Sequence, residues 1–203
     1  MGKKALQKRK NWQTQSGKEA LLAEESLFVI FETEFKNTDF ELIRHPKHLK
    51  NLYSSVCLDS ETLAQIYNPP NFDYAKTHWG VSPDFAIRNQ KTGKILFGEI
   101  KRQDGWVENK EPSAGRGNAH ERLCKLFTPG LIKAYRKISG IHSVEILPFW
   151  VIFQGDITRD PKRVREIVFW FDTYQNNFFM WRNGQTPNVL IAHFNQYLKA
   201  FLE

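Results

Sequence analysis

Apolar residues recur at helical spacing in two segments of the chain, residues 18–35 and residues 188–202. In each segment they repeat every three or four positions, which is the pattern of a helix with one buried face. The first stripe consists of Leu21, Leu22, Leu27, Phe28, Ile30, Phe31 and Phe35, and the second of Leu190, Ile191, Phe194, Leu198 and Phe201. The sequence therefore predicts an amphipathic helix in each segment.

Shorter apolar runs between these helices predict strands. Residues 84–88 and 95–101 are two such runs, and the polar segment 89–94, which contains Gly93, predicts a hairpin turn between them. The other predicted elements are a buried strand over 146–154, a strand over either 167–171 or 178–181, a helix from 118 or 119 to 137 that breaks at 128–130, and a short helix over 161–168. This order predicts an α/β fold with a mixed central β-sheet flanked by helices, in a single domain over residues 1–203.

The predicted hairpin brings chemically useful side chains together. If it is symmetric about the Lys91–Thr92 peptide, Asp84 lies directly opposite Glu99, and because side chains alternate along a strand, Lys101 shares their face. Opposed carboxylates repel each other, so a positive group is expected between them. A hard divalent metal ion takes oxygen ligands of this kind. The stretch therefore suggests a metal-dependent nuclease.

The same residue types also occur together by coincidence in a chain that is 25% charged. Glu108-Asn109-Lys110 and Asp160-Pro161-Lys162 have similar spacing, but neither follows an apolar strand run, and Pro161 would interrupt a strand ladder. Strand context therefore favours residues 84–101. A solvated hairpin face without chemistry remains the alternative to a catalytic site.

Composition narrows the class of protein. The 203 residues are 41% hydrophobic, which argues against disorder, and the net charge of +7 favours an anionic partner. Nucleic acid is the first expectation, an acidic membrane surface the second, and a merely soluble basic protein the alternative. Cys57 and Cys124 have no metal-ligand spacing and form no disulfide framework. No apolar run is long enough to span a membrane, so we expect a cytoplasmic protein, with residues 1–16 as a mobile basic arm.

A second segment, residues 113–122, combines small and base-contacting residues at an expected helix start. Small residues allow close approach to a surface, Asn pairs with adenine and Arg with guanine in the major groove, and helix amino-terminal amides favour phosphate. Residues 103–119 form a long predicted loop, and loops of that length are usually functional. The alternative is a flexible glycine loop, with His120 as an ordinary surface histidine.

Together, Pro83-Asp84, Glu99-Ile100-Lys101 and the segment from Ala114 to Arg122 resemble type II restriction endonucleases of the EcoRI kind, within the PD-(D/E)XK superfamily. The Gly-Asn-Ala-x-Glu-Arg part of that segment is more specific than the catalytic motif, which unrelated nucleases share. The resemblance is strongest between residues 79 and 170 and is closest to the members that recognise CAATTG.

The resemblance implies a role for each matching residue. Asp84, Glu99 and the backbone carbonyl of Ile100 would bind Mg²⁺, and Lys101 would contact the scissile phosphate and help to activate the attacking water. The residues implied to bind DNA are Arg116, Gly117, Asn118, Ala119, His120 and Arg122, with Glu121 orienting the arginines.

Specificity follows from the same comparison. Asn118 and Arg122 match family residues that recognise the inner AATT, and Arg116 replaces a small residue of the EcoRI pattern, which suits an outer C·G pair. The implied activity is hydrolysis of double-stranded DNA at CAATTG after the C, which leaves 5′-AATT overhangs with 5′-phosphates. A palindrome implies a homodimer, and the host of such an enzyme is expected to carry a cognate DNA methyltransferase that is not a stable partner. The alternatives are a structure-specific repair or junction-resolving nuclease and a non-catalytic basic DNA-binding module.

Overall fold

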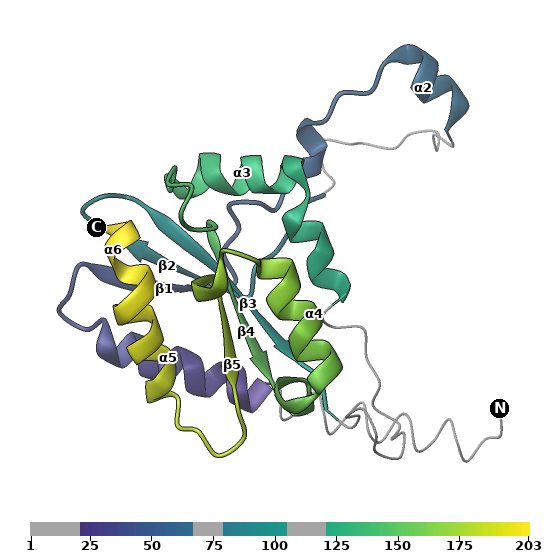
Figure 1. Cartoon of the computed structure of the whole chain (residues 1–203). Helices are drawn as coiled ribbons and strands as arrows, with labels where there is room; N and C mark the ends of the chain where they lie inside the picture. The colour runs from purple at the N-terminus through teal and green to yellow at the C-terminus, as the bar shows by residue number, and fades with distance from the viewer. Residues whose placement is uncertain (1–20, 67–78, 105–120) are drawn as a thin grey trace.

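The computed structural model describes residues 21–66, 79–104 and 121–203. Among these residues, five strands form one sheet of order β1-β2-β3-β4-β5 (Figure 1). The strands are β1 Phe40–Arg44, β2 Phe85–Asn89, β3 Ile95–Arg102, β4 Phe149–Gln154 and β5 Phe178–Trp181. The pairs β1–β2 and β2–β3 are antiparallel, whereas β3–β4 and β4–β5 are parallel, so the predicted mixed sheet is confirmed.

Helices cover both faces of the sheet. The helical elements are a helix over residues 21–34, η1 Leu52–Ser55, α2 Ser60–Gln65, η3 Glu121–Phe127, α3 Pro129–Ser139, η4 Asp156–Arg159, α4 Pro161–Phe171, η5 Gln175–Asn177, α5 Asn188–His193, the π-helical η6 Phe194–Leu198 and α6 Lys199–Leu202. Helix 21–34 and the carboxy-terminal helices pack on one face around Trp150. On the opposite face, η3, α3 and α4 pack around Phe149 and Phe153 (Figure 1).

The predicted amino-terminal helix is confirmed over the described residues 21–34, but two residues of its predicted stripe are exposed. Leu21 is 65% exposed and Leu22 is 71% exposed. The buried side of the helix contains Ala23, Leu27 and Phe31, which recur every four residues. Leu22 lies on the outer side of the helix, so the prediction that it faces the core, which rested on its apolar character alone, is wrong.

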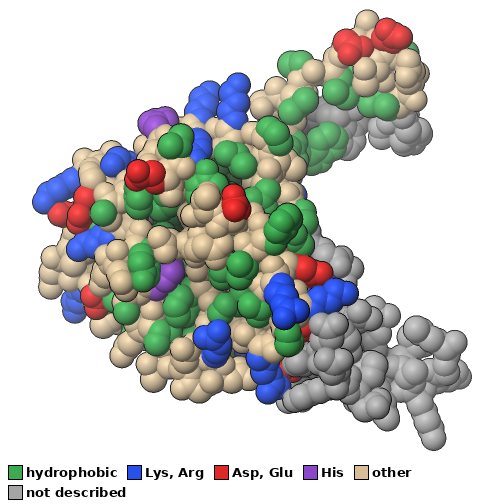
Figure 2. Space-filling model, viewed as in Figure 1, with side chains coloured by type: hydrophobic (Ala, Val, Ile, Leu, Met, Phe, Trp, Pro, Cys, Tyr) green, Lys and Arg blue, Asp and Glu red, His purple; other side chains and the backbone are tan. Residues whose placement is uncertain are grey.

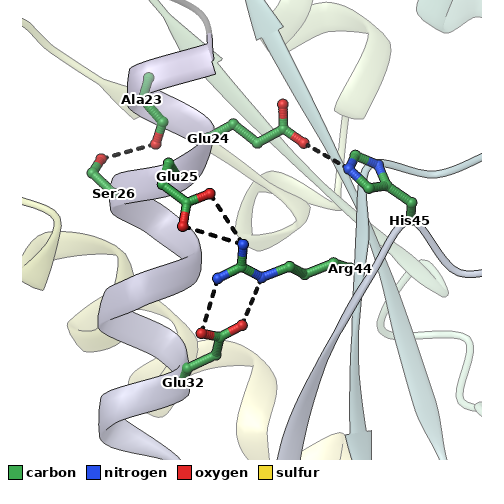
Figure 3. A network of polar contacts seen from close by, with 7 residues as sticks. All are labelled: Ala23, Glu24, Glu25, Ser26, Glu32, Arg44 and His45. Carbon is green, nitrogen blue, oxygen red and sulfur yellow. Dashed lines mark hydrogen bonds and ion pairs between the residues drawn. The ribbon is translucent and has the colours of Figure 1, made fainter.

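A network of charges joins helix 21–34 to the end of β1, a strand that sequence analysis did not predict. The Arg44 guanidinium donates to the Glu32 carboxylate at 2.7 Å and 2.9 Å and to Glu25 at 3.0 Å and 3.2 Å (Figure 3). The same guanidinium lies 4.8 Å from the centre of the Phe28 ring. These contacts hold β1 against the helix, and the next residue, His45, donates its amide to the Asp84 carbonyl at 3.0 Å.

The hairpin of β2 and β3 has the predicted register. Phe85 pairs with Gly98 and Arg88 with Ile95, which is the symmetry expected about the Lys91–Thr92 peptide. The Asn89 side chain accepts hydrogen bonds from the amides of the two residues at the tip of the turn, at 2.9 Å and 3.2 Å. Gly93 adopts a left-handed conformation with φ of 73°, which few other residues adopt without strain. The turn therefore fixes which residues of the two strands face each other.

Gly98 leaves the space in which the Phe85 ring lies. A Cβ at Gly98 would overlap that ring, which is fully buried between Phe28 and Trp150. We expect Gly98→Ala to lower the free energy of unfolding by about 1–3 kcal/mol, because the closely packed neighbours must shift. Urea denaturation measures this change, with Gly130→Ala as the control, since a Cβ at Gly130 would meet nothing within 4 Å. Equal stability of the two variants would contradict this packing argument.

Two crossovers on the same face make β3, β4 and β5 parallel. The break predicted at residues 128–130 is present, because η3 ends at Phe127 and α3 begins at Pro129, although η3 is a 3₁₀ helix rather than an α-helix. α3 ends at Ser139 and is capped by Gly140, whose φ of 69° is left-handed. β4 begins at Phe149, later than predicted.

The second crossover, which contains α4 and connects β4 to β5, decides between the two alternative strands predicted after residue 161. The Asp160 side chain accepts the amides of Lys162 and Arg163 and so caps α4, which begins at Pro161 and continues to Phe171. The alternative strand over 167–171 is therefore wrong, and the strand over 178–181 is confirmed as β5. The predicted helix over 188–202 is confirmed as α5, η6 and α6.

The chain between β1 and β2 carries an arm, residues 52–66, which contains η1 and α2. Leu52 at its base packs against the core, but the part with α2 stands away from the sheet, and acidic side chains lie at its tip among hydrophobic ones (Figure 1, Figure 2). The arm has Asp59 and Glu61 and no Lys or Arg, in a chain of net charge +7. Within the described ranges, no helix combines the length and the apolar character needed to cross a membrane.

Candidate active site

Asp84 is held in place by both neighbouring strands. Its amide donates to the Gly98 carbonyl at 3.0 Å, and its carbonyl accepts the His45 amide at 3.0 Å. Its carboxylate oxygen Oδ2 accepts the Ile100 amide at 2.6 Å. These three bonds fix the Asp84 carboxylate beside β3, one residue before β2 begins.

Glu99 and Lys101 lie on the same face of β3, as the alternation of side chains predicts. The Lys101 ammonium is 2.5 Å from Glu99 Oε2 and 3.9 Å from Asp84 Oδ2. The Glu99 side chain is only 6% exposed, whereas those of Lys101 and Asp84 are 21% and 31% exposed. The structure therefore brings the three predicted catalytic side chains together, with a cation between two carboxylates.

Burial and charge act in opposite directions on Glu99. Burial raises the pKa of its carboxyl, the nearby Lys101 ammonium lowers it, and the negative charge of Asp84 raises it again. The net direction is upward. A further positive charge between Asp84 and Glu99 would stabilise both in their ionised forms, which is the electrostatic condition for binding a metal ion.

A cleft of about 280 Å³ opens over these residues. Its walls consist of Ser82, Asp84, Glu99, Lys101, Leu123, Lys125 and Leu126. Sequence analysis did not identify Ser82 or Lys125 as site residues. Ser82 stands next to Pro83-Asp84, which was a local signal for it, but Lys125 reaches the cleft only because η3 folds back over the sheet.

The chemistry of the donors fits a hard divalent metal ion. Asp84 and Glu99 offer carboxylate oxygens, which such ions prefer. Among the described residues, no three side chains of His, Cys, Asp or Glu gather as a ligand set, so two carboxylates need oxygen from the backbone or from water. Ile100, between Glu99 and Lys101 on β3, is the expected source of a backbone carbonyl.

Most of the predicted DNA-binding residues lie outside the described residues. These are Arg116, Gly117, Asn118, Ala119 and His120. Glu121 and Arg122 are the first two residues of η3. The predicted recognition segment is therefore joined at one end to β3, which carries Lys101, and at the other to η3, which lines the cleft.

Comparisons with known proteins agree with one another. A model of the family described as type II restriction enzyme MunI matches residues 1–203. The type II restriction enzyme MunI of Mycoplasma sp is 61% identical over 203 residues, which is 100% of both chains. The crystal structure of MunI restriction endonuclease in complex with cognate DNA is similar with a TM-score of 0.81 and 61% identity, covering 95% of this chain and 98% of that chain. These findings confirm the predicted fold and family resemblance.

Proposed function

The chain belongs to the family of the type II restriction enzyme MunI and is therefore a site-specific endonuclease of DNA, and we propose that its site is the palindrome CAATTG. It cuts after the first C and leaves 5′-AATT overhangs with 5′-phosphates. The support for this site is the segment from Arg116 to Arg122, in which an extra guanidinium beside the Gly-Asn-Ala-x-Glu-Arg sequence suits an outer C·G pair. Membership of a family of type II restriction enzymes disfavours the two alternatives considered from sequence, a repair or junction-resolving nuclease and a non-catalytic DNA-binding module.

The observation that carries the proposed chemistry is the Lys101 ammonium between the carboxylates of Asp84 and Glu99. Asp84, Glu99 and the Ile100 carbonyl would hold Mg²⁺, and the ion would supply a Lewis acid that favours deprotonation of water and offsets charge on the phosphate. Lys101 donates to a nonbridging oxygen of the scissile phosphate and helps to orient the water. The leaving group is the 3′-oxygen of the C, so the ends are 3′-hydroxyl and 5′-phosphate.

The described carboxylates do two further things. The Asp84 carboxylate accepts the Ile100 amide and so fixes the Glu99–Ile100 peptide, which directly precedes the Ile100 carbonyl that would be the third ligand. The buried Glu99 carboxylate holds the Lys101 ammonium at the mouth of the site, where it meets the substrate.

Asn118 and Arg122 recognise the inner AATT, Glu121 orients the arginines, and Gly117, Ala119 and His120 contact the DNA.

Because the proposed site is palindromic, the active form is a homodimer with one active site for each strand. A cognate methyltransferase that protects CAATTG in the host is part of this proposal.

Digestion of a plasmid of known sequence, followed by end sequencing of the fragments, tests the reaction and the site together. We expect cuts only at CAATTG, after the C, in the presence of Mg²⁺, and no cuts when EDTA replaces it. A plasmid in which each CAATTG is changed at its outer pair is the matched control. Cuts at another sequence would refute the proposed specificity. So would a CAATTG plasmid that stays intact under conditions in which a different restriction enzyme cuts a control plasmid.

A further inference from the structure

We propose that Lys125 is a second DNA-binding cation of the catalytic cleft and that its ammonium holds a phosphate of the DNA backbone before the metal ion is bound. The inference rests on the proposed nuclease function and adds a residue that neither the catalytic motif nor the predicted recognition segment contains. Three observations support it. Lys125 lines the cleft, the other charged residues of the cleft sum to a negative charge, and, among the described residues, Lys101 is paired with a carboxylate whereas Lys125 is not.

The position of Lys125 is fixed by its neighbours in η3. Leu123 and Leu126 are 1% and 0% exposed and pack in the core below the cleft, so they anchor the helix over the sheet. The Lys125 carbonyl accepts the Thr128 amide at 3.1 Å and the Thr128 hydroxyl at 2.8 Å. The exposed Lys125 side chain between these anchors lines the same cleft as Asp84 and Glu99.

The cleft needs a second cation to accept a phosphate. Asp84 and Glu99 contribute two negative charges and Lys101 one positive charge, so these three residues alone would repel an approaching phosphodiester. Lys125 cancels the remaining negative charge of the cleft lining. The charge of Lys125 also acts on Glu99. Burial is the largest influence on the pKa of the Glu99 carboxyl and raises it, whereas the positive charge of Lys125 is among the influences that lower it.

The two lysines are not equivalent. Lys101 donates to Glu99 at 2.5 Å, and so its charge is largely engaged by a buried carboxylate. In the described parts of the chain, no ion pair ties the Lys125 ammonium to a carboxylate. Lys125 is therefore the lysine that is available to a phosphate in the absence of metal, and Lys101 acts on the scissile phosphate when the carboxylates hold a metal ion.

The test is binding without metal. Fluorescence anisotropy with a CAATTG duplex and with an unrelated duplex, in EDTA and over a range of salt concentrations, compares wild type with Lys125→Met, Lys125→Arg and Lys133→Met. Lys133 is an exposed lysine of α3 that does not line the cleft, so its variant is the matched control.

We expect Lys125→Met to weaken binding of both duplexes by about tenfold or more, because a charge-assisted contact is lost. The slope of log affinity against log salt should become shallower by about 0.9 for each cleft in the complex. Lys125→Arg should bind within about threefold of wild type, since it keeps the charge, and Lys133→Met should bind like wild type. In Mg²⁺, Lys125→Met should raise KM more than it lowers kcat, which is the sign of lost uniform binding.

Unchanged affinity and salt slope in Lys125→Met would overturn the proposal, as would equal losses in Lys125→Met and Lys125→Arg. Circular dichroism melting of the four proteins separates these outcomes from misfolding, and the arginine variant decides if the methionine variant does not fold. If wild type binds duplexes but does not cut CAATTG, the proposed specificity fails while the effect of Lys125 on binding is still measured.

Discussion

Replacing Asp84 by alanine is expected to lower the rate of DNA cleavage by about a thousandfold or more, while DNA binding in EDTA is retained or strengthened. Loss of one hydrogen-bond donor to the charge that develops in a transition state already costs about a hundred- to a thousandfold in rate, and Asp84 is a proposed ligand of the metal ion that would offset such charge here. Binding should not fall, because the variant removes a negative charge that faces the phosphate. Single-turnover cleavage of a CAATTG duplex in Mg²⁺ and anisotropy in EDTA measure the two quantities.

Asp84→Asn separates the charge of Asp84 from its hydrogen bond. The asparagine side chain keeps a carbonyl oxygen that can accept the Ile100 amide, but it has no negative charge. We expect it to be as inactive as Asp84→Ala and as stable as wild type. Asp39→Ala is the control, since Asp39 forms an exposed pair with Lys91 at the opposite end of the hairpin and its loss should change little. Loss of both cleavage and binding in Asp84→Asn would mean that Asp84 has a structural role.

Replacing Arg116 by alanine is expected to relax discrimination at the outer base pair. A bidentate contact to guanine is worth about 1–3 kcal/mol, which corresponds to roughly a 5- to 150-fold loss in the ratio of kcat/KM between CAATTG and GAATTC. Discrimination within the inner AATT should stay as it is in wild type, because Asn118 and Arg122 are unchanged. The measurement is single-turnover cleavage of short duplexes that differ in one symmetric pair of positions.

The control for Arg116→Ala is Lys125→Met, which removes a positive charge close by in the sequence. It should weaken cleavage of all duplexes alike, since a phosphate contact carries no base information. If Arg116→Ala prefers CAATTG over GAATTC by the same factor as wild type, Arg116 does not read the outer base pair.

The local part of the site was predictable, because a hairpin places its side chains by rules that involve only neighbouring residues. The register of β2 and β3 follows from the turn, and the alternation along β3 puts Glu99 and Lys101 on one face. The residues 128–130 that interrupt the helix are likewise a local signal, carried by Pro129.

What the sequence did not reveal depends on packing between distant segments. β1 was missed because its five residues become a strand only through pairing with β2. The first residue of β2, Phe85, lies 45 positions after the first residue of β1, Phe40. The inward side of helix 21–34 was mistaken at Leu22 because several apolar residues lie on both sides of that helix. Lys125 has no distinguishing neighbours in sequence, and only the return of η3 over the sheet places it in the cleft.

The segment 103–122 connects the two walls of the cleft, because it follows β3, which carries Lys101, and precedes Leu123 in η3. This connection has a thermodynamic consequence. If a correct base sequence favours the arrangement of these two walls that the metal ion also favours, each ligand must raise the affinity of the other by the same factor. The affinity for metal then depends on the DNA sequence that is bound, so a wrong sequence is rejected twice, once on binding and again when the metal ion is taken up.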